Sequence, residues 1–400
     1  MQYIETEKFT DVYIRCKTLM PLQAKTITAL NVLIYMMKAK TEDMDSKQKL
    51  TSFLSKTYST KVSFGLSAYG DTIAVTVGFK FIRPDWIENE NYTMDIVYIL
   101  DQVLFHSCLD EENFEEAKYL LKNRLLAIQD DPASLSYLYA CKLANPKHSL
   151  AIPTQGRLED LETLSLEDVI KVYDLYMALG KHYYVCGKLN ETLYQYVNGL
   201  DFHTGLVSER TLLPKIEPSF KTWTKPISQS YITQIYATGI DTSTKDYYAL
   251  AVMNVILGSG SKSLLFDEVR EKYSLCYSIG ATPLRYDGAL MITTGTNKED
   301  IDQVLNLIDA QIERLIHMDY DDIYLDVAKK SLKDMLISGM DKPSSLLMDA
   351  FLDDLLHRQM SVEEKIQKYE AITKEDVARI ASYLHLVSCA IVKEDESHEV

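Results

Sequence analysis

The chain has 400 residues, enough for two domains of ordinary size, each with its own core. Hydrophobic residues make up 46% and charged residues 25%, which is typical of a soluble globular protein and excludes a disordered chain. The formal net charge of −16 at pH 7 argues against binding to nucleic acids or to anionic membranes, because both are negatively charged.

The N-terminal residues lack the basic and apolar segments of a signal peptide, and no apolar run reaches the roughly 20 residues that span a bilayer. We therefore expect a cytoplasmic protein. The six cysteines are dispersed and include no C-x-x-C pair. In a cytoplasmic chain this pattern indicates free thiols and no disulfide framework.

Hydrophobic periodicity predicts strands and helices intermixed in both halves of the chain. In the first half the predicted strands are residues 9–17, 62–81 (two strands) and 181–187, and the predicted helices are 26–38, 92–107, 111–130 and 165–178. In the second half the predicted strands are residues 231–237, 274–282, 289–296 and 387–392. The predicted helices of the second half are 245–257, 263–272, 298–317, 321–339, 343–357 and 373–383. Strands and long helices mixed in this way indicate an α+β fold, with a mostly antiparallel sheet in each half and helices packed on one of its faces.

Three pairs of similar segments show that the two halves are related. Residues 117–125 and 328–336 share the pattern A-K-x-x-L-K-x-x-L at an offset of 211 residues, and Pro132 and Pro343 follow at the same offset. Two shorter pairs occur in the same order, namely 31–33 with 254–256 and 165–169 with 373–377. We therefore predict two homologous domains, 1–200 and 227–400. Residues 201–226 contain three prolines and no clear periodicity, which indicates a linker.

Most motifs that signal chemistry are missing. The glycine-rich segment 258–263 is not a phosphate-binding loop, because Ser261 stands where that motif requires glycine before the lysine. The eight histidines never come within three or four residues of one another, the spacing that lets two of them share a metal ion on one helix face. There is also no G-x-S-x-G nucleophile motif. From these residues we expect no catalytic group, no metal site and no cofactor.

One segment retains a possible binding function. Residues 266–278 run from a helix end into a strand, with Arg270 near the end of the helix and Tyr277 beyond the turn. A guanidinium and a phenol are both suited to donate hydrogen bonds to a peptide carbonyl or a developing oxyanion. From the chemistry alone, a structural ion pair of Arg270 together with a half-buried Tyr277 is the favoured interpretation, and the binding role is the alternative.

The same region resembles a known family. The sequence L-G-S-G-S-K-S-L-L-F, followed by V-R-E-K and L-C-Y-S, is similar to a motif in the C-terminal half of insulinase- and pitrilysin-type peptidases. The similarity follows the order of that family over residues 33–81, 154–187 and 250–393. It implies two homologous α+β domains that form half of a clamshell around peptides.

The resemblance also implies a loss. Zinc-binding members carry H-x-x-E-H on the first helix, where the glutamate activates water. The alignment places Asn31, Ile34 and Tyr35 there, so the zinc site does not carry over. In two-chain members, one chain holds zinc and the other contributes an Arg/Tyr pair to substrate binding, and this role carries over to Arg270 and Tyr277.

The resemblance is closest to zinc-less bacterial subunits associated with elongation factor P modification. It therefore implies a non-catalytic subunit of a heterodimeric metallopeptidase. This chain would hold peptide in half of a chamber, while a partner with H-x-x-E-H hydrolyses it and carries the only zinc. The alternative is a peptide-binding scaffold or homodimer with no role in a peptidase.

Overall fold

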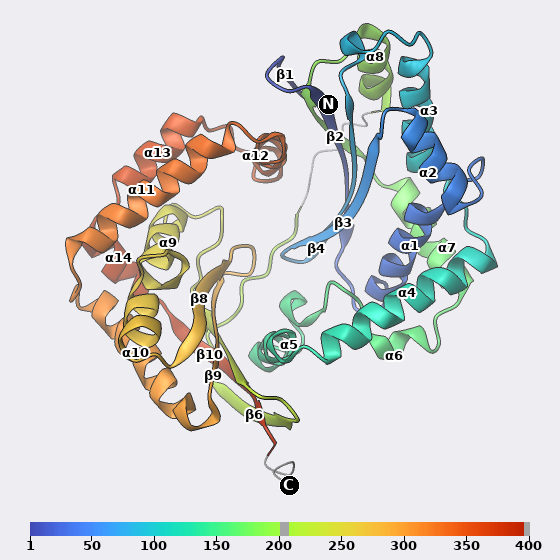
Figure 1. Cartoon of the computed structure of the whole chain (residues 1–400). Helices are drawn as coiled ribbons and strands as arrows, with labels where there is room; N and C mark the ends of the chain where they lie inside the picture. The colour runs from blue at the N-terminus through green and yellow to red at the C-terminus, as the bar shows by residue number, and fades with distance from the viewer. Residues whose placement is uncertain (201–207, 396–400) are drawn as a thin grey trace. The chain divides into compact units, whose positions relative to one another are not determined.

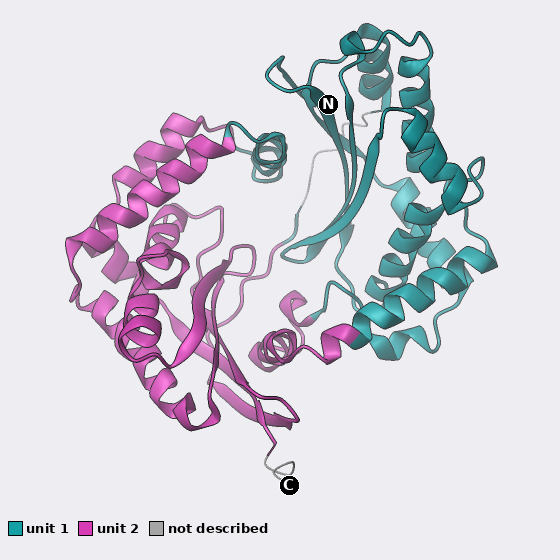
Figure 2. Ribbon diagram, viewed as in Figure 1, with its two compact units in different colours: residues 1–126, 152–209, 340–358 teal, residues 127–151, 210–339, 359–400 magenta. Residues whose placement is uncertain are grey.

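The computed structural model describes residues 1–200 and 208–395. The chain folds into two compact units, each assembled from three segments of the sequence (Figures 1 and 2). Unit 1 comprises residues 1–126, 152–209 and 340–358, and unit 2 comprises residues 127–151, 210–339 and 359–400. Within the described residues, no helix is long and apolar enough to cross a membrane.

Unit 1 is built on a five-stranded sheet with the strand order β1-β5-β2-β4-β3. Its strands are β1 (Gln2–Glu5), β2 (Asp11–Pro21), β3 (Lys61–Tyr69), β4 (Thr72–Ile82) and β5 (His182–Gly187). β1 pairs in parallel with β5, and the other neighbours are antiparallel. The helices of this unit are α1 (Ile27–Ala39), α2 (Lys47–Lys56), η1 (Pro84–Trp86), α3 (Tyr92–Phe105), α4 (Glu111–Gln129), α6 (Leu158–Leu161), α7 (Leu166–Ala178), α8 (Glu191–Leu200) and α12 (Pro343–Leu355).

Unit 2 repeats this sheet in the order β6-β10-β7-β9-β8. Its strands are β6 (Ser219–Lys225), β7 (Ser230–Ala237), β8 (Cys276–Leu284), β9 (Ala289–Thr296) and β10 (His385–Glu394). Its helical segments are α5 (Pro132–Ala144), η2 (Ser149–Ala151), α9 (Tyr247–Asn254), η3 (Val255–Ser259), η4 (Phe266–Lys272), η5 (Lys298–Asp300), α10 (Ile301–Ile316), α11 (Asp322–Gly339), α13 (Val362–Glu370) and α14 (Lys374–Ala381).

The two sheets have the same topology, which confirms the duplication and the α+β fold. β6 pairs in parallel with β10, as β1 does with β5, and the remaining neighbours are again antiparallel. Matching helix starts support the same conclusion. Capping boxes begin α7 at Ser165 and α14 at Thr373, and Pro132 and Pro343 each occupy the first turn of the helix after a long helix.

The segment predicted as a linker contains a strand. Ser219–Lys225 forms β6, which lies at the edge of the second sheet and pairs with β10 from Ser219↔Ser388 to Lys225↔Glu394. An edge strand can stay largely exposed, and its side chains therefore showed no clear alternation of apolar and polar residues. Residues 201–207 of the predicted linker lie outside the described residues.

The predicted domain boundaries follow the sequence repeat, and the compact units differ from them by one exchanged helix each. α5 lies in the first half of the sequence but packs on β7 and β10 of unit 2 (Figure 2). Its Ala140, Cys141 and Ala144 join Ile235 and Val387 in one buried cluster. The Ser388 hydroxyl donates a hydrogen bond of 2.9 Å to the Ala140 carbonyl.

α12 makes the reciprocal exchange into unit 1. It packs on β2 and β5, where the fully buried Phe351 contacts the rings of Tyr69 and Tyr184 edge-on. The hydroxyl of Tyr184 donates to Asp354 at 3.0 Å. The residue before it, Tyr183, points to the opposite face, because successive side chains of a strand alternate. The exchanged helix therefore covers the second face of the sheet, which the prediction of helices on one face did not include.

We predict that Phe351→Ala destabilises unit 1 strongly. The substitution leaves a cavity between α12 and the sheet, and such changes lower the free energy of unfolding by about 3–5 kcal/mol. Denaturant unfolding followed by tyrosine fluorescence measures the loss. Ser344→Ala is a matched control, because Ser344 lies on the same helix and is exposed. Equal stabilities of the two variants would show that α12 is not an integral part of the unit.

We also predict a pH dependence that arises from Lys17 on β2. Its side chain lies over the Phe351 ring at 4.2 Å and donates to Thr76 at 3.0 Å. Burial lowers the pKa of Lys17 to about 8, below the value of about 10.4 for a lysine in an unfolded chain. Between these two values the unfolded state binds more protons, so stability rises with pH.

The measurement compares the wild type with Lys17→Met across this pH window. Relative to the variant, the wild type should gain about 1–3 kcal/mol in the free energy of unfolding between pH 7 and pH 10, because one pKa unit corresponds to about 1.4 kcal/mol. A difference between the two proteins that stays constant with pH would contradict the assignment.

Candidate functional site

The positions predicted to match a zinc motif come together in one pocket of unit 1. Asn31, Ile34 and Tyr35 lie on α1 and face a pocket of about 290 Å³ between this helix and β3. The other residues that line this pocket are Lys38, Phe64, Gly65, Leu66, Arg124, Thr154 and Gln155. Its wall is therefore formed by α1, by the edge strand β3, by α4 and by the segment that follows η2.

Asn31 has a structural role in this wall. Its side-chain amide donates to the carbonyls of Ile27, one helical turn earlier, at 2.8 Å and of Thr154 at 2.9 Å. A second link joins the same two segments, because the Thr28 hydroxyl donates to Asp160 at 2.7 Å. Asn31 is only 5% exposed, and its two hydrogen bonds supply the partners that a buried polar side chain requires. Asn31 thus attaches the 154–160 segment to α1.

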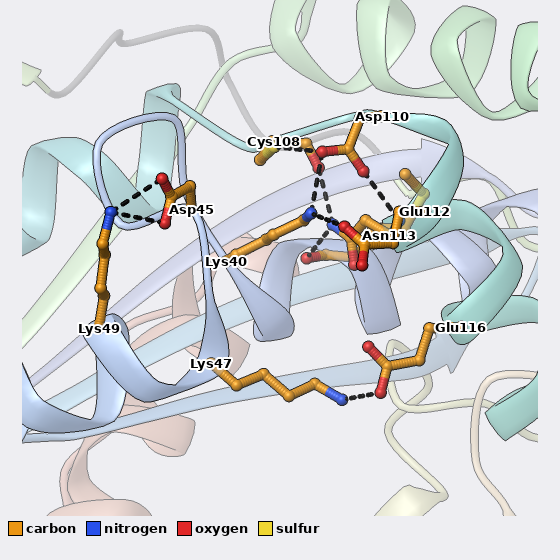
Figure 3. A network of polar contacts seen from close by, with 10 residues as sticks. Lys40, Asp45, Lys47, Lys49, Cys108, Asp110, Glu112, Asn113 and Glu116 are labelled. Carbon is orange, nitrogen blue, oxygen red and sulfur yellow. Dashed lines mark hydrogen bonds and ion pairs between the residues drawn. The ribbon is translucent and has the colours of Figure 1, made fainter.

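A polar network fixes α1 to the start of α4 (Figure 3). Lys40 follows α1 and pairs with Asp110 at 2.9 Å and with Glu112 at 3.4 Å. Asn113 donates from its side chain to the Met36 carbonyl at 3.1 Å and to the Cys108 carbonyl at 2.7 Å. The hydrogen bond from Lys40 lowers the pKa of Asp110, which keeps the carboxylate ionised. The network sets the relative position of the two helices that line the pocket.

The side chains at the pocket favour an anion over a metal cation. Zinc is bound by cysteine, histidine and carboxylate side chains, whereas α1 presents an amide, an aliphatic group and a phenol here. Lys38 and Arg124 add two positive charges. Throughout residues 1–200 and 208–395, no group of three or more His, Cys, Asp or Glu residues is placed to hold a metal ion. The residues at this position therefore do not fit zinc.

Unit 2 has a pocket of about 420 Å³ at the corresponding place. Asn254, which matches Asn31 in the sequence repeat, lines it together with Ser261 and Met335. Because the offsets of the repeat are 223 and 211 residues, Ser261 corresponds to Lys38 and Met335 to Arg124. The two positions that are cationic in unit 1 are thus uncharged in unit 2, where Arg285, at another place in the lining, is the one charged residue among the described residues of the pocket.

Arg270 and Tyr277 lie on consecutive elements of unit 2. Arg270 belongs to the π-helix η4, where its guanidinium stacks over Phe266 at 4.6 Å and lies 3.7 Å from the Glu271 carboxylate. Tyr277 belongs to β8, and its side chain is 86% exposed. The pairing of β8 with β9 shifts between Cys276 and Ile279, so Tyr277 lies in a β-bulge. A bulge turns a side chain away from the regular alternation of the strand.

The turn between these two residues is strained. Ser274 has a φ of +55°, which is uncommon for residues other than glycine. Its N–H and that of Tyr273 bond to the Arg270 carbonyl, so the backbone of Arg270 is held in the turn. Tyr277 is not the half-buried residue of the structural alternative, whereas Arg270 does have an acidic neighbour. Both side chains reach solvent and have polar atoms that can bind a ligand.

Reasoning from the sequence missed most of the unit 1 pocket. Lys38, Arg124 and Gln155 come from three separate segments, and none belongs to a motif. One signal was available: within the best-matched part of the repeat, Arg124 in one half stands opposite Met335 in the other. When one copy of a duplicated segment has a charged residue and the other copy has an apolar residue at the same position, the fold does not require either residue there.

Comparisons with known proteins relate the chain to one family of peptidases. Residues 186–332 match the family described as "Peptidase M16 inactive domain". The chain is 23% identical to the probable inactive metalloprotease YmfF of Bacillus subtilis, over 98% of this chain and 95% of that protein. It is 21% identical to the antilisterial bacteriocin subtilosin biosynthesis protein AlbE of Bacillus subtilis, over 98% of each chain.

Two solved structures have the same fold. A conserved protein from Enterococcus faecalis has a TM-score of 0.89 at 22% identity, covering 99% of this chain and 96% of its own. A peptidase M16 inactive domain from Pseudomonas fluorescens has a TM-score of 0.82 at 16% identity, covering 100% and 96%. Both similarities extend over the whole two-unit architecture.

We predict that the purified chain binds no stoichiometric zinc. Asn31, Ile34 and Tyr35 offer no imidazole, thiolate or carboxylate, and the cations Lys38 and Arg124 would repel a metal ion at the same pocket. Equilibrium dialysis against micromolar zinc, followed by elemental analysis, measures the content. About one zinc per chain, lost when a residue of this pocket is mutated, would contradict the prediction.

Proposed function

Because the chain belongs to the M16 peptidase family, we propose that it is the non-catalytic subunit of a two-chain metallopeptidase. The partner is a related chain that carries H-x-x-E-H and the zinc ion. This chain contributes half of a peptide-binding chamber and contacts the substrate through Arg270 and Tyr277. The peptide is hydrolysed on the partner, since no group of three or more His, Cys, Asp or Glu among residues 1–200 and 208–395 is placed to hold a metal ion.

Two features of the chain together support the proposal: one site departs from the family's zinc motif, and another matches the family's Arg/Tyr motif. The zinc-motif positions hold Asn31, Ile34 and Tyr35, and Asn31 has become part of the helix packing. Arg270 and Tyr277, in contrast, keep their polar groups accessible on a π-helix and a β-bulge. π-Helical turns and bulges are frequent at functional sites. A pure scaffold would have no need for this pair.

The chemistry of the pair suits a peptide backbone. The guanidinium of Arg270 and the phenol of Tyr277 are both hydrogen-bond donors, and a peptide offers carbonyl oxygens as acceptors. Stacking on Phe266 restricts the guanidinium, so less side-chain entropy is lost when a ligand binds. The two donors can orient the peptide, or stabilise the negative charge that would develop on the scissile carbonyl oxygen while the partner hydrolyses the bond.

We predict that Tyr277→Phe and Arg270→Ala each reduce peptide turnover by the assembled pair of chains. Loss of one donor to a transition-state oxygen costs about 3–4 kcal/mol, or roughly a hundredfold or more in kcat. If Arg270 binds the substrate before the reaction, the loss appears in KM instead. Steady-state kinetics with the zinc-bearing partner and a fluorogenic peptide measure both quantities.

Tyr273→Phe provides the matched control, because Tyr273 is also an exposed tyrosine on the same turn. It should leave turnover unchanged, and thermal unfolding should show all three variants folded. Wild-type kcat and KM in both Tyr277→Phe and Arg270→Ala would make the pair structural. The rival function, a peptide-binding scaffold or homodimer outside any peptidase, would then be favoured.

A further inference from the structure

The pocket of unit 1 concentrates positive charge on a strongly acidic protein. The chain carries a net charge of −16, yet Lys38 and Arg124 line one pocket of about 290 Å³. Neither has an ion-pair partner among the described residues, whereas Lys40, two residues after Lys38, pairs with Asp110 and Glu112. Two unpaired cations repel each other, so a bound anion would stabilise this arrangement.

The fold does not require these cations. In the corresponding pocket of unit 2, Ser261 and Met335 occupy the equivalent positions, and the same sheet, first helix and long helix form around them. The Lys40 network and the packing of Asn31 position α1 and α4 without using Lys38 or Arg124. The two charges are therefore available for a ligand.

The adjoining strand offers a binding surface for an extended chain. β3 lies at the edge of its sheet and pairs only with β4 within the described residues. Its free edge presents backbone donors and acceptors, which an added strand can pair. Gly65 lies at the pocket, and a Cβ built on it would meet no atom within 4 Å. The space beside the strand is therefore open.

We propose that this pocket binds a carboxylate of an extended peptide that lies along β3. Lys38 and Arg124 are the cationic partners of the carboxylate, with Arg124 suited to a paired, fork-like contact. The half-buried phenol of Tyr35 is a further donor in the same pocket. The carboxylate is either the C-terminus of the peptide or an acidic side chain. This site deepens the proposed function, since it names the class of peptide that the subunit recognises.

The test uses the full chain without any partner and three pools of random fluorescein-labelled decapeptides. Their variable positions contain only alanine, valine, leucine, threonine, tyrosine and asparagine. The first pool has a free C-terminal carboxylate, the second is amidated, and the third is amidated with one glutamate at a varied position. Fluorescence anisotropy gives an apparent Kd for each pool. The first and third pools separate the two sources of the carboxylate.

We expect a carboxylate-bearing pool to bind at least about tenfold tighter than the amidated pool without glutamate, as hydrogen bonds to charged groups allow. In Lys38→Gln/Arg124→Gln this preference should disappear. Lys122→Gln is the matched control, because Lys122 is exposed on α4 but does not line the pocket, and it should keep the preference. Gly65→Val should weaken binding of whichever carboxylate pool shows the preference, because its side chain fills the open space.

Equal binding of all pools, or a preference that survives in the double variant, would overturn the proposal. Lys38 and Arg124 are both exposed, so the variants retain the core, and circular dichroism verifies their folding. The outcome is independent of turnover with a zinc-bearing partner. If the carboxylate preference is absent but the Arg270 and Tyr277 variants still reduce turnover, only this site is refuted. If the preference is present but those variants turn over peptide like the wild type, the peptidase role is refuted and a peptide-binding protein is left.

Discussion

Each sheet of this protein is closed on its second face by a helix from the other half of the sequence. α5 covers the second sheet through Ala140, Cys141 and Ala144, and α12 covers the first through Phe351. A sheet face without such cover would expose a large apolar surface to water, so the exchange is a condition for either unit to be stable. It also explains why Lys17 is buried with a lowered pKa, since α12 lies over it.

The duplication leaves two equivalent positions that can carry different chemistry. The first helix, the edge strand and the long helix form a pocket in both units, with Lys38 and Arg124 in one and Ser261 and Met335 in the other. Apart from the hydrogen bonds of Asn31, the structural contacts lie elsewhere, in the caps, the sheet pairing and the exchanged helices. The other side chains at the pockets can therefore differ without loss of the fold, so one architecture can carry different chemistry.

Much of the fold could be predicted from the sequence, because the decisive signals are local. Capping boxes at Ser165 and Thr373 and prolines at the first turns of α5 and α12 mark helix starts whatever lies around them. The helix exchange could not be predicted, because small residues on one face of α5 show that the face is buried but not which sheet covers it. β6 was missed for a similar reason: its Phe220 is 65% exposed, so the strand has little apolar alternation.

The candidate sites likewise combine features that the sequence predicts with features that arise only in the fold. The C-terminal family motif predicted Arg270 and Tyr277, and the missing H-x-x-E-H motif predicted Asn31, Ile34 and Tyr35 as the positions that replace it; both remain predictions. The exposure of Tyr277 depends on a bulge in the pairing of β8 with β9, and the cationic pocket depends on four segments that meet only in the fold. Neither feature could be predicted from the sequence.

The exchange of α5 and α12 between the two halves also has a consequence for synthesis on the ribosome. The first sheet is complete once β5 has emerged, yet Tyr69 and Tyr184 stay uncovered until α12 has been synthesised. A nascent chain that stalls after β5 and before α12 therefore exposes an apolar sheet face to chaperones and proteases.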